Sequence, residues 1–486
     1  MARNRSFFLA LVFFFLGIAI LLSRMTWDSY AIDLDVPLLI LLGILCIAPA
    51  IVGLIRNKFY IFEPVHTYSL STFVYFVVVP LTLIYSGDFY FSGINYRPEL
   101  PRVILLAFFA LIGFYIGYFW ERHTKDSKKR PEYLVFDKPV KDFIHTWSIR
   151  LLIFFSILVG LWVVTARIPL STLWVFGKAS YGDAWREAQG VQIGYLYAAR
   201  EALPACLFML IASRSTKNWR LWHILLLLLY TLLLSGPGGR YYALLPTLGA
   251  FVFYFLERKR SPKIWQVSLV ILLIFYFIVG GLGFYRNPGI ELGQTEFNVD
   301  TAWETFVGGS QLVLSTAASI YVVPRYSDYL YGYSFIQLLT QPIPRFLWPA
   351  KPSWFGPSEL SSYWSYSAAA PFWVSFYLNF GYIGVIIGTM VLGWFSRKLF
   401  DSYRNDPQNI FAQVLLAVYI PFMIHGYGRG SNEPAFVIYG FLYVILPVLL
   451  LRGLTKWRFK SQFKPDYEGL NISIDSPKLL IDKPDK

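Results

Sequence analysis

The chain has 486 residues, of which 56% are hydrophobic and only 15% charged, and its formal net charge is +14. A soluble protein of this length carries far more charge, and long apolar runs recur from end to end, so the composition indicates a polytopic helical membrane protein. The positive charge gathers in alternate loops, so membrane orientation explains it better than nucleic-acid binding.

The apolar runs predict an all-α fold of about 12 transmembrane helices, each near the ~20 residues that a bilayer requires. No small-residue cleavage site follows the first run, so we expect a retained first helix. The sixth span contains Arg200 and Glu201, which form an internal ion pair, line a cavity, or indicate that the span is misplaced. The predicted spans are roughly 7–23, 36–55, 66–85, 102–120, 148–166, 190–213, 219–235, 239–257, 264–284, 373–396, 408–425 and 434–452.

The basic residues predict the orientation. With a cytoplasmic N-terminus, roughly 30 of the 43 Lys and Arg residues lie inside and about 13 outside, as the positive-inside rule requires. Both termini are then cytoplasmic. The expected regions are spans one to nine in 1–284, an extracytoplasmic loop with short helices in 285–371, spans ten to twelve in 372–452, and a flexible cytoplasmic tail in 453–486.

The segment 285–371 is long, aromatic and poor in charge, unlike a linker. Loops of this length in compact proteins usually carry function. Within it, the apolar run 302–322 predicts an interfacial or re-entrant helix.

Five arginines fall on the predicted outer side, against the positive-inside bias. An anionic ligand such as a diphosphate is the simplest reason for them. They are Arg240, Arg286, Arg325, Arg345 and Arg429.

Arg240 and its neighbour Tyr241 follow a Gly-Pro-Gly-Gly turn. Glycines let backbone amides approach a ligand, and a helix N-terminus with a guanidinium suits a phosphate. The alternative is a plain helical hairpin with Arg240 snorkelling to headgroups.

Four prolines in the run 341–352 predict an extended, rigid backbone that presents Arg345 and Lys351. Trp348 offers a face on which a sugar ring can stack. The alternative is an aromatic belt at the membrane interface.

The turn predicted between the last two spans collects His425, Arg429 and Glu433. His425 is a candidate proton acceptor or a plain helix-end residue, and Glu433 is a candidate base or an N-terminal helix acid. Elsewhere, Asp33 and Asp35, with Asp28 nearby, could hold a divalent ion or form an ordinary acidic loop. Cys46 and Cys206 lie inside apolar runs and are expected to be buried, and no nucleotide or zinc motif is present.

Together these residues resemble the Wzy family of bacterial O-antigen and oligosaccharide repeat-unit polymerases. The resemblance rests on four stretches and is most convincing from about residue 190 to 452. The stretches are Gly238–Arg240, Ile343–Pro352, Tyr377–Gly384 and Gly428–Gly430.

The resemblance implies a fold similar to the GT-C glycosyltransferases, in the bacterial inner membrane. It implies that a growing glycan moves from undecaprenyl diphosphate onto a new lipid-linked unit at the outer face, without a cofactor or metal. The implied partners are the undecaprenyl-diphosphate-linked oligosaccharide and membrane lipids, with a chain-length regulator protein as a further candidate, and no nucleic acid. The candidate catalytic residues are Arg240, Arg345, Arg429, His425 and Glu433, and the candidate substrate-binding residues are Arg286, Lys351, Arg325, Trp348 and Tyr241.

Two other functions stay open at this level. A related O-antigen ligase would share the outer loop and the arginines. A flippase or transporter of lipid-linked glycans would show two related halves, and the halves of this chain do not look alike.

Overall fold

The computed structural model is almost entirely helical in the part of the chain that it describes. Two short antiparallel sheets pair β1 (Tyr90–Phe91) with β2 (Ile94–Asn95) and β3 (Tyr133–Leu134) with β4 (Phe463–Lys464). The described residues are 35–56, 59–120, 133–134, 136–165, 199–213, 221–234, 240–273, 311–340, 343, 347–350, 370–429, 434–460 and 463–464.

The helices follow the predicted spans closely. Spans two to twelve each overlap a described helix or run of helices. The first span, residues 190–198 of the sixth and residues 274–284 of the ninth lie outside the described residues. In chain order the helices are α2 (Asp35–Ile55), α3 (Pro64–Phe73), the π-helix η1 (Val74–Val78), α4 (Val79–Ser86), the 3-10 helix η2 (Arg97–Glu99), α5 (Leu100–Phe119), α6 (Lys138–Thr165), α9 (Leu203–Ser213), α10 (Leu221–Leu234), α11 (Arg240–Glu257), α12 (Ile264–Leu273), α15 (Gln311–Val322), α16 (Tyr333–Thr340), α18 (Phe372–Asn405), α19 (Ile410–Arg429) and α20 (Pro434–Arg458).

Among the described residues, six helical segments are long and apolar enough to cross a membrane. This confirms the all-α polytopic membrane class. The count of twelve spans and the likeness to the GT-C fold stay predictions. The six segments are Asp35–Ile55, Pro64–Ser86, Arg97–Phe119, Lys138–Thr165, Phe372–Asn405 and Gly440–Arg458.

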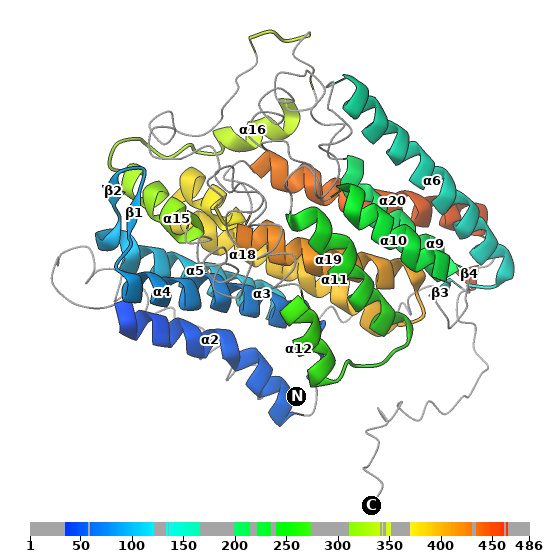
Figure 1. The fold of residues 1–486 in the computed structure, drawn as a ribbon, viewed down its shortest axis with the longest axis horizontal. Helices are drawn as coiled ribbons and strands as arrows, with labels where there is room; N and C mark the ends of the chain where they lie inside the picture. The colour runs from blue at the N-terminus through cyan, green and yellow to red at the C-terminus, as the bar shows by residue number, and fades with distance from the viewer. Residues whose placement is uncertain are drawn as a thin grey trace, which may run out of the picture.

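Helix α5 lies at the centre of the bundle. In its apolar window 89% of the residues are buried, compared with 22% in α6, so α5 packs against protein all round whereas α6 presents most of its surface outward. Figure 1 shows the same arrangement, with α2 and α6 at opposite edges and α5, α18 and α19 between them. The all-apolar sequence of α5 suits this position, because a helix that is hydrophobic on every side is a buried one.

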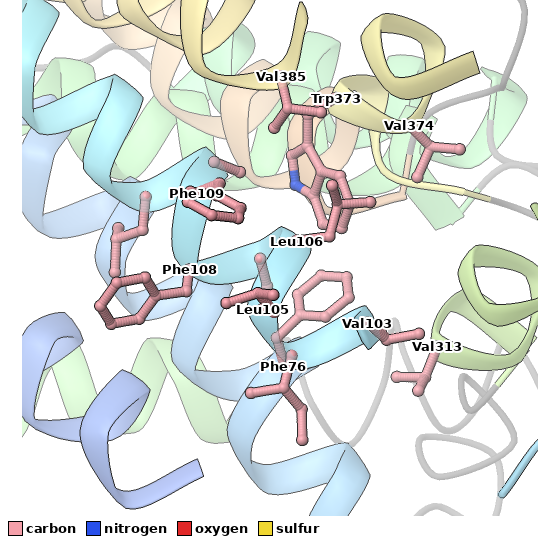
Figure 2. Close-up of a cluster of buried hydrophobic side chains, with 14 of the residues drawn as sticks. Phe76, Val103, Leu105, Leu106, Phe108, Phe109, Val313, Trp373, Val374 and Val385 are labelled. Carbon is pink, nitrogen blue, oxygen red and sulfur yellow. The ribbon is translucent and has the colours of Figure 1, made fainter. Parts of the chain in front are cut away.

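Around α5, side chains from many elements form one hydrophobic core, part of which is drawn in Figure 2. Phe76 of η1 and Trp373 of α18 meet with ring centroids 5.1 Å apart. Leu106 of α5 and Val313 of α15 belong to the same buried cluster. The core therefore joins segments that are about 300 residues apart in the sequence.

Glycines bring α5 and α18 into backbone contact. A Cβ at Gly113 would overlap Thr389, a Cβ at Gly117 would overlap the Met390 carbonyl, and a Cβ at Gly393 would overlap the Phe114 carbonyl. Helices in a bilayer associate through close van der Waals packing, which small residues four apart allow. Gly113 also lies near Ile386 and Gly117 near Met390, so residue numbers rise together on both helices and the two helices run parallel.

Contacts between helices define the two ends of the bundle. We name the two ends of the bundle the Glu99 end and the Glu63 end. At the Glu99 end, α4 and α19 finish and five helices begin, namely α2, α5, α11, α18 and α20. At the Glu63 end, α3 begins directly after Glu63. Gly43 lies near Phe73 and Gly53 near Phe59, so α3 runs antiparallel to α2. The short connection between α18 and α19 and the contact of Ser396 with Tyr419 make those two helices antiparallel. The contact of His145 with Ser213, and the cluster of Phe155 with Leu203, do the same for α6 and α9.

Helix α18 is interrupted near the Glu99 end. Gly381 has φ 64° and ψ −154°, a conformation open essentially to glycine alone. The break frees the carbonyls of Leu378 and Asn379, which accept hydrogen bonds from the Leu330 and Tyr331 amides at 2.9 and 3.0 Å. The Asn379 side chain accepts from the Gly332 amide and donates to Ser334, so the segment 330–334 is tied to the broken helix.

Two features differ from the expectations. The helix expected within 302–322 is α15, and its side chains from Leu312 to Ile320 are all buried, so it lacks the lipid-facing surface of an interfacial helix, whereas a re-entrant helix stays a prediction. Helix α20 runs to Arg458, past the expected end of the last span, and β4 pairs beyond it. These differences arise because tertiary contacts extend or bury segments whose local composition is ambiguous.

Candidate active site

Two neighbouring helices bring three of the predicted residues to one end of the bundle. Helices α11 and α19 lie against each other, and a Cβ at Gly249 of α11 would sit 3.2 Å from the Ala417 carbonyl of α19. Arg240 begins α11, about 13 Å before Gly249 along the helix axis, and His425 lies about 12 Å beyond Ala417 on the antiparallel α19. Arg240 and His425 therefore lie at the same depth at the Glu99 end, and Arg429 lies one turn further on.

The structure describes Arg240 and Tyr241 as helical residues of α11, and residues 235–239 before them lie outside the described part of the chain. That Arg240 lies in a first helical turn, whose free amides favour an anion, stays a prediction. The structure describes Arg240, Tyr241, His425 and Arg429 only by their places on α11 and α19.

The expectation of a turn from His425 to Arg429 is wrong, because α19 continues as a helix through Arg429. Glycines at 426 and 428 each weaken a helix by about 1 kcal/mol relative to alanine. Packing of α19 against α11 and α20 offsets that loss. As a consequence His425 and Arg429 are four residues apart on one helix and share a face.

The intramembrane residues Arg200 and Glu201 are buried, at 2% and 8% exposure. They lie in a short 3-10 turn that leads into α9. The Tyr230 hydroxyl of α10 donates to the Arg200 carbonyl at 3.3 Å, and the Glu201 carboxylate approaches Gly440 of α20. Residues 199–213 of the sixth span therefore form a buried element, and the Glu201 carboxylate lies beside the first half of α20.

A second charged set surrounds Glu99, the residue before α5. Its carboxylate accepts from Arg102 Nη1 at 2.9 Å and lies 3.7 Å from Arg325 Nη2. The Arg325 guanidinium also covers the Tyr321 ring, 4.9 Å from its centroid. Arg325 was predicted from its outward position, whereas Glu99 and Arg102 were not. The i, i+3 spacing of Glu99 and Arg102 at a span start was the available signal.

The remaining loop candidates are only partly placed. Arg286, Arg345, Lys351 and Glu433 lie outside the described residues. Trp348 is described and half-buried, with turn conformations on both sides of it at Leu347, Pro349 and Ala350. The extended backbone predicted for 341–352 is therefore wrong for Leu347, Pro349 and Ala350, because the fixed φ of proline suits a turn as well as an extended chain.

The acidic residues of the first loop have a structural partner. Asp35 begins α2, is buried, and forms an ion pair with Arg97. Asp28 and Asp33 lie outside the described residues, which contain no group of three His, Cys, Asp or Glu side chains that could hold a metal ion. Cys46 and Cys206 are both buried free thiols, as predicted.

Sequence reasoning missed a polar network at the opposite end. The Tyr118 hydroxyl donates to Glu63 at 2.8 Å, and Arg397 lies 3.7 Å from Glu63 and donates to Asp401 at 2.9 Å. Burial raises the pKa of the Glu63 carboxyl, whereas Tyr118 and Arg397 oppose that rise. The network ties α3, α5 and α18 together at the Glu63 end.

The long apolar helices define a polytopic membrane protein. The family model for the O-antigen polysaccharide polymerase Wzy matches residues 4–354. The chain belongs to this family and is a membrane enzyme that polymerises glycan repeat units. The match contains the Gly-Gly-Arg turn and the proline-rich run, and it ends before Tyr377–Gly384 and Gly428–Gly430. No curated protein and no solved structure matches the chain.

Proposed function

We propose that the Glu99 end faces away from the cytoplasm and transfers a growing glycan from undecaprenyl diphosphate to the non-reducing end of a new lipid-linked repeat unit. The observation that carries this proposal is the placement of Arg240, His425 and Arg429 at one end of the packed helices α11 and α19. The segment 285–371 then lies on the outer side of the inner membrane, and both termini are cytoplasmic.

The charge of the described loops supports this orientation. Basic residues gather at the Glu63 end, which is typical of the cytoplasmic side. At the Glu99 end, two arginines are paired with carboxylates, Arg97 with Asp35 and Arg102 with Glu99, so their positive charge is offset. The basic residues of the Glu63 end include Arg56, Lys138, Lys141, Arg258, Lys259, Arg260, Lys263, Arg404, Lys456, Arg458 and Lys460.

The main catalytic requirement of this glycan transfer is stabilisation of the negative charge that develops on the leaving group. As the C1–O bond to the diphosphate breaks, the electron pair and the negative charge move to the departing lipid diphosphate. Arg240 and Arg429 hold this charge, because guanidinium groups bind phosphate oxygens bidentately and are effective in a partly dehydrated site. Arg286, Arg345 and Lys351 extend the same positive surface from the outer loop.

The acceptor hydroxyl loses its proton as it attacks C1. His425 is the candidate base by position, because an imidazole changes charge near neutral pH and lies at the depth of Arg240. Glu433 is the second candidate. Trp348 and Tyr241 are assigned to sugar binding, and a chain-length regulator protein is a further partner.

The test is the length of the glycan made by a deletion strain that expresses each variant. Arg240→Ala and Arg345→Ala should abolish long chains and leave single repeat units, while the protein stays in the membrane at the wild-type level. Arg260→Ala, at the Glu63 end, is the matched control and should give a wild-type ladder. Wild-type ladders from both Arg240→Ala and Arg345→Ala would overturn the diphosphate role. Long unattached chains in the deletion strain would indicate a ligase instead.

A further inference from the structure

A polymerase of lipid-linked units binds two glycans at once, and the arginines of α11 and α19 account for only the departing diphosphate. The set around Glu99 lies at the same end of the bundle on other elements, namely the start of α5, the end of α15 and the loop after it. The two sets therefore offer separate places for two substrates.

The set around Glu99 has a defined surface. Arg325 is 43% exposed and is held between the Glu99 carboxylate and the Tyr321 ring. The hydroxyls of Tyr321 and Tyr326 lie 3.0 Å apart, and their ring centroids are 5.3 Å apart. Tyr326 is 51% exposed, so a guanidinium edge and an aromatic face are presented next to each other.

The charge of this surface suits a sugar better than a phosphate. Glu99 lies beside both Arg102 and Arg325, and Asp35 is paired with Arg97, so two carboxylates offset most of the charge of three guanidinium groups. A diphosphate would be repelled by the carboxylates, whereas neutral hydroxyls can accept from guanidinium N–H groups and exchange hydrogen bonds with phenols. An aromatic face also packs against the apolar C–H surface of a sugar ring.

The geometry points to Arg325, Tyr321 and Tyr326, supported by Glu99, as the binding surface for the terminal sugar of the acceptor repeat unit. The role of this sugar as the acceptor rests on the proposed function, whereas the binding of a free oligosaccharide to this surface does not. Glu99 is a positioning residue here, because it orients Arg325 and lies below the exposed surface at 4% exposure.

The experiment measures binding of the repeat-unit oligosaccharide, released from its lipid, to the full-length protein in detergent or nanodiscs. Tyr326→Ala and Arg325→Gln should each weaken binding about five- to tenfold, roughly the value of one aromatic contact or one charged hydrogen bond. Tyr326→Phe should retain most of the affinity, because it keeps the ring. Tyr85→Ala, which removes a 95% exposed tyrosine from the same end, is the matched control and should bind as wild type.

The kinetic test uses in-vitro polymerisation with lipid-linked units. Arg325→Gln should raise the KM for the acceptor with little change in kcat, whereas Arg240→Ala should lower kcat and still bind the free oligosaccharide. Glu99→Gln should lie between wild type and Arg325→Gln in KM. Wild-type affinity and KM in both Tyr326→Ala and Arg325→Gln, or no binding of the oligosaccharide to the wild-type protein, would overturn the inference. If the wild-type protein binds the oligosaccharide through these residues but does not polymerise, the proposed function fails and the binding surface stands.

Discussion

Gly117 of α5 lies so close to Met390 of α18 that a single methyl group at residue 117 would overlap the Met390 carbonyl oxygen. The obstacle is backbone, which cannot swing aside as a side chain can. This contact, repeated at Gly113 and Gly393, fixes the distance between the two central helices. The polar network around Glu63 depends on that distance, because Tyr118 belongs to α5 and Arg397 to α18.

We expect Gly117→Ala to destabilise the protein by about 1–3 kcal/mol or to prevent its accumulation, because the helices must separate. The measurement is thermal unfolding of the detergent-solubilised protein, together with its level in the membrane. Gly160→Ala is the matched control, since a Cβ there meets no atom within 4 Å and alanine favours a helix. Equal stability of the two variants would contradict the close packing of α5 and α18.

Gly381→Ala should also destabilise the protein by about 1–3 kcal/mol, for a different reason. The φ and ψ of Gly381 are strained for any residue with a Cβ, and the new methyl group would lie 3.2 Å from the Tyr329 ring. Gly453→Ala, on the open side of α20, provides the control. Because the break in α18 holds the segment 330–334, the variant should also shorten the glycan ladder. A variant as stable as wild type would show that α18 runs through residue 381 without interruption.

Glu63 predicts a specific pH dependence. Burial raises the pKa of this carboxyl above the ordinary value of 4.5, so the folded protein favours its protonated form. The contribution of protonated Glu63 to stability is therefore full below the ordinary pKa of 4.5 and is lost as the pH rises through the pKa of the folded protein. Glu63→Gln, which stays neutral and can still accept from Tyr118, should gain stability relative to wild type over the same range.

Glu63→Ala separates the charge from the hydrogen bond. It leaves the Tyr118 hydroxyl without the acceptor now at 2.8 Å, which should cost about 1–3 kcal/mol at any pH. Unfolding temperatures of the three proteins between pH 5 and 8 give the comparison. A wild-type protein that gains stability over Glu63→Gln as the pH rises would show that the ion pair with Arg397 dominates.

The proposed orientation is testable with two single cysteines, because the native Cys46 and Cys206 are both buried. Asp88→Cys, in the exposed loop at the Glu99 end, should react with a membrane-impermeant maleimide in intact spheroplasts. Arg260→Cys, at the Glu63 end between α11 and α12, should react only after the membrane is opened. A reporter fused after Trp354 should likewise read as extracytoplasmic. The reverse labelling pattern would invert the topology.

The sequence by itself determined the helical membrane class and the positions of the six described segments that are long and apolar enough to cross a membrane. These follow from a local property, namely the length of the apolar runs. The resemblance to the family came from four short linear stretches, and the match over residues 4–354, which contains two of them, confirms the family.

The tertiary structure alone decided which of these elements meet. Nothing local couples Glu99 to Arg325, Glu63 to Arg397, or Gly117 to Met390, since the partners are more than 200 residues apart. The burial of α15 and the extension of α19 through Arg429 were likewise decided by packing, which outweighs the local preference of a glycine-rich or weakly apolar segment. The length of an apolar run predicts that a helix lies in the bilayer, but only close packing in three dimensions selects the neighbours of that helix.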